Sequence, residues 1–187
     1  MARWSSAQPG HGDGAARSEH AGYWGEQNWL SKFLPYDASL RVPLLARWPG
    51  HLSAGSDPRL VFSLDVTATV LDAAAVEPTI PLDGDSFLGT PTHDFVFAEY
   101  FEDPSNGTMP TWALVGGSDW KYIETEMTST GRATVRYLEY YDLATDPNEW
   151  VNAIGDLSAE NDLTPEQLDE LAAKVEAGRV CGGTSCP

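Results

Sequence analysis

The chain has 187 residues, a length that suits one domain with a sizeable hydrophobic core. Its 28 acidic and 11 basic residues give a formal net charge of −17, which argues against nucleic acid and anionic membranes as partners, because both attract clustered Lys and Arg. No apolar run approaches the roughly 18–20 residues of a membrane span. The N-terminus lacks the apolar core of a signal peptide. We therefore expect a globular protein with no membrane span, whose acidity mainly favours solubility.

The first half of the chain predicts one strand and one helix. Residues 1–17 are rich in Gly, Ala, Ser and charged residues, lack a hydrophobic period, and predict a loop or disordered tail. The short apolar run at 40–48 predicts a buried strand. Apolar residues then recur at spacings of three and four and predict a helix over 65–75 with one buried stripe, made of Leu64, Ala68, Leu71 and Ala75.

The second half of the chain predicts a small antiparallel sheet. Apolar and aromatic runs predict strands at 94–100, 111–115, 120–124 and 139–143. Because the connections are short, we expect neighbouring strands to pair antiparallel. The aromatic residues of these strands favour a half-buried pleated surface over a platform for stacking sugars.

A terminal helix is expected after this sheet. Thr164 followed by Pro165 predicts its start, since Pro is favoured in the first turn. We expect the helix to run to about Arg179 and to end at Gly178 and the glycines after Cys181. Its buried face should carry Leu168, Leu171 and Val175. The order of elements predicts an α/β edge followed by an α+β subdomain.

The two cysteines, Cys181 and Cys186, lie close together near the C-terminus. The glycines between them let the chain double back, so the spacing favours a small disulfide. Metal binding is the weaker interpretation, because two ligands alone seldom make a site and no histidine is near. A disulfide predicts maturation in an oxidising compartment, which conflicts with the absence of a signal peptide.

An acid–histidine pair, Glu19-His20, stands ahead of Lys32 with two glycines in between. Such a run can bring a metal-ligand pair and a cation to one site. Further short motifs follow in order along the chain: Gly25-Glu26-Gln27, Tyr36-Asp37, Arg41-Val42-Pro43-Leu44, Trp120-Lys121-Tyr122-Ile123, Asp142-Leu143 and Asp146-Pro147-Asn148-Glu149.

The order and spacing of these motifs resemble the C-terminal portion of a sulfatase, in the alkaline-phosphatase-like superfamily, over about residues 18–187. The resemblance implies that 18–90 form the C-terminal part of an α/β catalytic domain, at the edge of its sheet. It implies that 91–187 form a C-terminal α+β subdomain with a small antiparallel sheet and a terminal helix. Residues 1–17 are then a disordered or non-homologous tail.

What the family implies is hydrolysis of a sulfate ester, possible substrates including sulfated carbohydrates. A Cys or Ser in a Cys/Ser-x-Pro-x-Arg motif is oxidised to formylglycine and attacks sulfur, while a calcium ion offsets charge on the sulfate oxygens. By resemblance, Glu19 and His20 fall on the metal-ligand pair and Lys32 falls on the lysine that contacts sulfate. The family also implies a secreted or periplasmic parent protein.

Several positions depart from the family pattern. Glu19 replaces an Asp, Ala21 replaces a Gly and Gln27 replaces a His. The chain contains no Cys/Ser-x-Pro-x-Arg motif and no first Asp-Asp metal pair, and neither cysteine has the motif around it. We therefore expect no nucleophile in this chain, no activity from the chain alone, and a need for an N-terminal portion to complete the fold.

Alternatives remain open at this stage. A second register uses His11-Gly12-Asp13 as the metal element, with an insertion before Lys32. The chain could also be a non-catalytic module that binds sulfated glycans, or part of a phosphoester hydrolase of the same superfamily. Tyr36, Asp37 and Arg41 are expected to be structural, and His51 and His93 to be ordinary surface residues.

Overall fold

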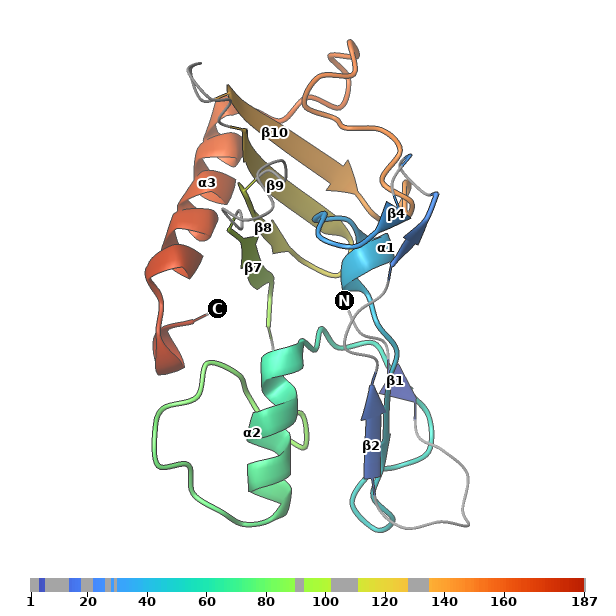
Figure 1. Ribbon diagram of the computed structural model, residues 1–187, viewed down its shortest axis with the longest axis vertical. Coiled ribbons are helices and arrows are strands. Elements are labelled where there is room, and N and C mark those ends of the chain that lie inside the picture. The colour runs from blue at the N-terminus through green and yellow to red at the C-terminus, as the bar shows by residue number, and fades with distance from the viewer. Residues whose placement is uncertain are drawn as a thin grey trace.

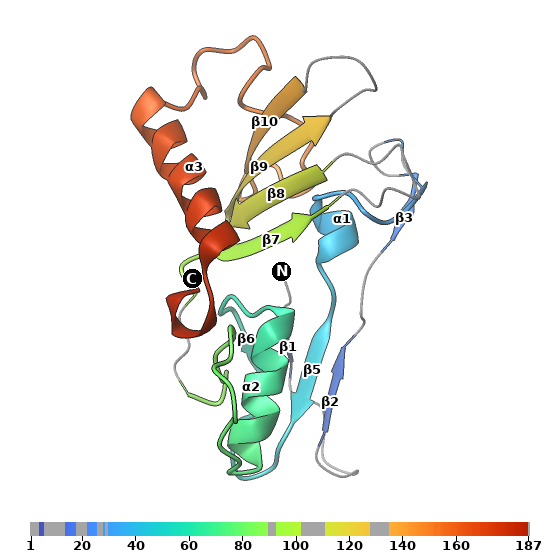
Figure 2. The same cartoon turned by 60° about the vertical axis from the view of Figure 1, so that its left-hand side comes forward.

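The computed structural model describes residues 4–5, 14–17, 22–25, 28, 30–89, 93–101, 111–127 and 135–186. These residues form two parts, one above the other in Figure 1. The lower part holds a mixed sheet and helix α2 (Ser63–Ala73), and the upper part holds an antiparallel sheet with helix α3 (Pro165–Val180). The short helix α1 (Asp37–Leu40) lies against the upper sheet, on the other side from α3 (Figure 2).

The lower sheet has the order β2-β5-β1-β6. Strand β1 pairs parallel with β5, whereas β2–β5 and β1–β6 are antiparallel. Strands β1 and β2 lie within residues 1–17, where the sequence predicts a loop or tail instead. Both strands pair with β5, which therefore has a neighbour on each side. The strand bounds are β1 Trp4–Ser5, β2 Gly14–Arg17, β5 Leu44–Arg47 and β6 Ser56–Asp57.

Helix α2 begins two residues earlier than the sequence predicts. The Asp65 carboxylate determines which face of the helix is buried. Asp65 is fully buried, and its carboxylate accepts hydrogen bonds from the backbone N–H groups of Phe62 and Asp85, at 3.0 and 2.9 Å. The expected apolar stripe is therefore only partly buried: Ala68 is inside, but Leu64 is 47% exposed. A bound N–H at the first turn satisfies one of the donors that every helix start leaves open.

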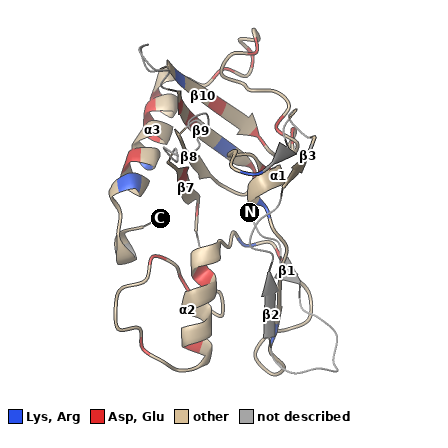
Figure 3. Cartoon of the chain, viewed as in Figure 1, with Lys and Arg blue, Asp and Glu red and all other residues tan. Residues whose placement is uncertain are grey.

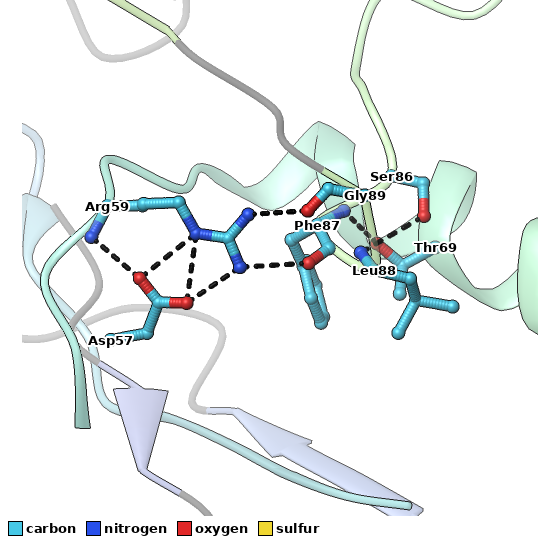
Figure 4. A network of polar contacts seen from close by, with 7 residues as sticks. All are labelled: Asp57, Arg59, Thr69, Ser86, Phe87, Leu88 and Gly89. Atoms are coloured by element: carbon cyan, nitrogen blue, oxygen red, sulfur yellow. Dashed lines mark hydrogen bonds and ion pairs between the residues drawn. The ribbon is translucent and has the colours of Figure 1, made fainter. Parts of the chain in front are cut away.

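Two polar contacts fasten the segment after α2 to the helix and to β6. The Thr69 hydroxyl donates to the Asp65 carbonyl and accepts from the Phe87 N–H group. The Arg59 guanidinium donates hydrogen bonds to the Asp57 carboxylate. It also donates to the carbonyls of Phe87 and Gly89, at 3.1 and 2.8 Å (Figure 4). Phe87 is thereby held in the lower core, which it shares with Leu44, Ala46 and Val61.

The upper sheet is a four-stranded antiparallel meander in the order β10-β9-β8-β7, which confirms the predicted strands and their pairing. The last strand, β10, begins earlier than predicted, at Val135. The bounds are β7 Val96–Tyr100, β8 Thr111–Gly116, β9 Trp120–Met127 and β10 Val135–Asp142. A separate two-stranded sheet pairs β3 (Tyr23–Trp24) with β4 (Leu30–Ser31).

Side chains alternate between the two faces of the upper sheet, as the period of a strand requires. One face carries Trp112, Leu114, Ile123 and Tyr141 and packs on Tyr36 and Leu40 beside α1. The other face carries Ala113, Val115 and Tyr122 and packs on α3 through Val175, Leu168 and Leu171, as predicted. Both faces are therefore covered, and the predicted aromatic residues lie in the core.

Helix α3 starts where the sequence predicts, because Thr164 and Gln167 cap each other's backbone N–H groups. Gly178 does not end the helix. It lies inside α3, buried, where a Cβ atom would overlap the side chain of Phe97 on β7. After α3, the sulfur atoms of Cys181 and Cys186 lie at bonding distance around a short 3-10 turn (Gly183–Ser185), with Cα atoms 4.9 Å apart.

None of the helices in the described part of the chain is both long enough and apolar enough to cross a membrane.

The substitution Gly178→Ala should destabilise the protein. Overpacking against Phe97 is expected to cost about 1–3 kcal/mol, although Ala is the better helix former by ~1 kcal/mol. Urea unfolding of the variant measures the difference. Gly182→Ala is the matched control, since no atom lies within 4 Å of a Cβ atom at that position. Equal stability of the two variants would contradict the close packing of α3 on β7.

Asp57 should make stability depend on pH below neutrality. Hydrogen bonds from Arg59 lower the pKa of Asp57 from its ordinary value of 3.8. The stabilisation is then complete above pH 3.8 and is lost as the pH falls through the lower, folded-state pKa. Asp57→Asn should therefore destabilise the protein at neutral pH and progressively less below pH 3.8 in urea unfolding. The same substitution at the exposed Asp162 is the control and should change stability less than Asp57→Asn at neutral pH.

Candidate functional site

Lys32 follows β4 directly and lies at the junction of the two parts of the fold. It is half-buried and lines a cavity of about 480 Å³. The cavity lies between the start of α2 and the face of the upper sheet that carries Trp112 and Leu114. Apolar side chains supply most of the wall, among them Leu40, Leu44 and Leu114. A low-dielectric wall strengthens the attraction between a cation and an anion in the cavity.

The Lys32 ammonium lies 5.5 Å from the centre of the Phe33 ring. The ion pairs among the described residues do not include Lys32, whereas every other lysine of the chain, Lys121 and Lys174, is paired with carboxylates. Acidic residues occur on α2, α3 and the upper sheet, and Lys and Arg are few (Figure 3). Lys32 is therefore the lysine that lies outside the ion pairs of the described residues. An ammonium group in such a cavity suits an anionic ligand.

The backbone next to Lys32 has an unusual conformation. Phe33 has a φ of +92°, which is rare for a bulky residue. Its carbonyl accepts a hydrogen bond of 2.7 Å from the indole N–H of Trp112, a buried residue of β8. Its ring lies 5.7 Å from that of Tyr100, which in turn stacks on Trp112 at 6.0 Å. Contacts with β7 and β8 thus stabilise the strained residue.

A buried ionic cluster holds the next residues of the same loop. The ammonium of Lys121, a residue of β9 that is 2% exposed, lies 2.5 Å from Asp37 Oδ1 and 2.6 Å from Glu149 Oε1. It also donates to the Pro35 carbonyl at 3.3 Å. The second oxygen of Glu149 accepts a 2.6 Å hydrogen bond from the Asp37 N–H group. Three distant segments therefore meet at Lys121.

The electrostatics of this cluster favour a charged Asp37. Burial alone raises the pKa of the Asp37 carboxyl, but the Lys121 ammonium outweighs burial, so that the pKa is lowered. Burial raises the pKa of Glu149, and Lys121 offsets this only in part. Arg41, 41% exposed, adds a weaker contact to Asp37 at 3.6 Å. Loss of Lys121 would leave two buried carboxylates without their main counter-charge.

A pair of tyrosines joins the loop to β10. The hydroxyls of Tyr36 and Tyr141 both donate to Glu139 Oε2, at 3.0 and 2.6 Å, and their rings meet edge to face. Burial, together with the nearby Glu139, raises the pKa of both phenols, so both stay protonated as donors at neutral pH. This contact completes the attachment of residues 33–37 to the upper sheet.

The predicted site residues fall partly outside the described residues. Glu19, His20 and the alternative element at 11–13 lie there, so their roles as metal ligands stay predictions. In the parts of the chain that the structure does describe, no group of three or more His, Cys, Asp or Glu side chains could hold a metal ion. The roles of Lys32, Glu19 and His20 thus depend on the sequence resemblance.

One expectation about the other residues needs correction. His93 is not a surface residue: its side chain is 5% exposed, and Nε2 lies 3.0 Å from Asp65 Oδ1. Asp37 is structural, as expected, and its buried partner is Lys121. The sequence pattern gives no sign that Lys121 and Glu149 are buried partners, although both lie in the motifs that carry the resemblance. His51 is exposed, as expected, and stacks on Trp48.

Comparison with known families matches residues 25–176 to the family described as N-sulphoglucosamine sulphohydrolase, C-terminal. Among curated relatives, an arylsulfatase of Clostridium perfringens is 30% identical, over 89% of this chain and 34% of the relative. An N-acetylgalactosamine-6-O-sulfatase of Bacteroides thetaiotaomicron is 27% identical, over 78% and 29%. Human arylsulfatase A is 29% identical, over 79% and 33%. The chain thus spans about a third of the length of these relatives.

Among solved structures, the protein BT4656, in complex with its substrate D-glucosamine-2-N,6-O-disulfate, has a TM-score of 0.68 and 23% identity. The match covers 87% of this chain and 33% of that one, and it shows a shared fold. The fold is that of the C-terminal region of sulfatases of the alkaline-phosphatase-like superfamily. The chain belongs to the family of N-sulphoglucosamine sulphohydrolase C-terminal domains.

The substitution Lys121→Met should destabilise the protein strongly. Removing one partner of a buried ionic cluster leaves uncompensated charge, which typically costs about 3–5 kcal/mol. Urea unfolding measures the loss. Lys174→Met is the matched control, because Lys174 pairs with Glu170 on the surface of α3, where such pairs contribute about 0.3–0.5 kcal/mol. Losses of similar size in both variants would show that the Lys121 cluster has no special role.

Proposed function

We propose that this chain contributes the C-terminal part of a sulfate-ester hydrolase and that Lys32 binds the sulfate group. The family match over residues 25–176 supports the class of reaction. The observation that carries the role of Lys32 is its position on the cavity wall. Lys32 takes part in none of the ion pairs of the described residues, and the next residue, Phe33, has a strained backbone. We also propose the boundary between the two parts of the fold near residue 90.

A fixed ammonium suits the chemistry of sulfate-ester cleavage. Charge builds on the oxygens of the transferred group and on the leaving oxygen, and a cation already in place stabilises that charge without reorganising. The apolar wall formed by residues such as Leu40 and Leu114 excludes water and so strengthens this interaction. The chain offers Lys32 for binding, and it contains no Cys/Ser-x-Pro-x-Arg nucleophile motif. We therefore infer that the nucleophile is not among its residues.

We propose calcium as the metal, with Glu19 and His20 as ligands. When bound, calcium would offset the negative charge of the sulfate oxygens. Calcium takes 6–8 ligands, mostly oxygens, and this pair supplies few of them. The pair alone therefore does not make a complete calcium site, and a complete site needs further carboxylates.

Sulfated carbohydrates are the proposed substrate class. The named relatives support this choice, since one acts on N-acetylgalactosamine 6-sulfate by its name and BT4656 was solved with a sulfated glucosamine. We propose a secreted or periplasmic location, which the same family supports. It agrees with a proposed disulfide between Cys181 and Cys186, whose Cα separation lies in the range of known disulfides.

Sulfate should protect Lys32 from chemical acetylation. The chain has three lysines, so mass spectrometry can follow Lys32, Lys121 and Lys174 separately. If Lys32 binds sulfate, its acetylation rate falls as sodium sulfate is added at constant ionic strength with sodium chloride. The rate at Lys174, on the surface of α3, should not change.

An unchanged rate at Lys32 would overturn its role as a sulfate ligand. Phosphate in place of sulfate separates the two reaction classes of the superfamily. Protection by sulfate at lower concentration than by phosphate supports the sulfatase proposal, and the reverse order favours a phosphoester hydrolase.

A further inference from the structure

We propose that Trp112 and the cluster of Asp37, Lys121 and Glu149 are positioning residues that fix Lys32 for binding the sulfate group. The proposal rests on the proposed function and adds to it a role for the upper sheet. None of these residues needs to touch the substrate. They act through the backbone of residues 33–37, which continues directly from Lys32.

The loop is held at alternate residues by groups from the upper part of the fold. The Phe33 carbonyl accepts from Trp112 on β8, and the Pro35 carbonyl accepts from Lys121 on β9. The Asp37 N–H group donates to Glu149, which lies in the segment between β10 and α3. Because these bonds come from separate elements, and those to Pro35 and Asp37 are buried, the loop cannot shift as a unit without breaking several of them.

The strain at Phe33 links this attachment to Lys32. A non-glycine residue with φ near +92° is strained, and it keeps this conformation only where the surrounding structure holds it there. The indole N–H of Trp112 and the ring of Tyr100 are the surrounding groups that hold it. Without the indole donor, Phe33 is free to return to a negative φ, and such a rotation reorients the adjacent Lys32.

The cluster also decides which lysine of the cavity is available to an anion. Lys121 lines the same cavity as Lys32, but it is 2% exposed and lies against two carboxylates. Its charge is thus committed to holding the loop. Lys32 takes part in none of the ion pairs of the described residues, so the two lysines divide the structural and the binding role between them.

The pair of substitutions Trp112→Phe and Trp120→Phe tests this inference. Both exchange Trp for Phe on the upper sheet, but Trp120 faces α3 and the other core. We expect Trp112→Phe to raise the sulfate concentration for half-protection of Lys32 by about tenfold or more, as for other displaced binding groups. Trp120→Phe should leave that concentration unchanged, whatever its effect on stability. Equal protection in the folded Trp112→Phe variant and the parent chain would overturn the proposal.

A second pair covers the case in which Trp112→Phe does not fold. Glu149→Gln keeps the size of the side chain and weakens the contact to Lys121, and Glu124→Gln makes the same change at a buried site facing α3. Only Glu149→Gln should weaken protection by sulfate. Equal protection in these two variants would overturn the role of the cluster.

The proposed function and the positioning role fail in different ways. If sulfate does not protect Lys32 in the parent chain, Lys32 is no sulfate ligand, and the positioning proposal falls with it. If sulfate protects Lys32 equally in the parent chain and in the folded variants, the proposed function stands and the positioning proposal alone is wrong.

Discussion

The ammonium of Lys121 is the contact on which the rest of the structure depends. It joins Asp37 at the start of α1, Pro35 in the preceding loop and Glu149 beyond β10, and Asp37 and Glu149 are 112 positions apart in sequence. Charges taken out of water are stabilising only when each has its partner, so the cluster tolerates few other arrangements of these segments. The antiparallel sheet therefore fixes the loop that carries Lys32.

The two faces of that sheet serve different purposes. The face toward α3 is mainly apolar, closed by Val175 and by the approach of Gly178 to Phe97. It also buries Glu124, which pairs with Arg179 of α3. The face toward α1 combines aromatic rings with buried and partly buried hydrogen bonds to the backbone of residues 33–37. An apolar core would hold the loop without specifying its register, whereas directed bonds to single carbonyls and N–H groups specify it.

Local patterns explain how much of this the sequence could predict. The strands of the upper sheet follow from short apolar and aromatic runs, and the start of α3 follows from Thr164 and Pro165, which are signals within a few residues. The roles of Lys121 and Glu149 could not be derived this way, because burial of a charge depends on partners far away in sequence. Asp65 shows the same limit: it rotates α2 away from its predicted apolar stripe because its partners, Asp85 and His93, arrive from a later segment.

The most direct measurement is hydrogen exchange of the Asp37 backbone amide, which donates to the buried Glu149 carboxylate. If the cluster holds the loop, this amide exchanges as slowly as those of the central strands β8 and β9, through unfolding of the whole upper part. Exchange at the rate of an exposed loop would show that residues 33–37 open independently of the sheet. In that case the cluster could not position Lys32.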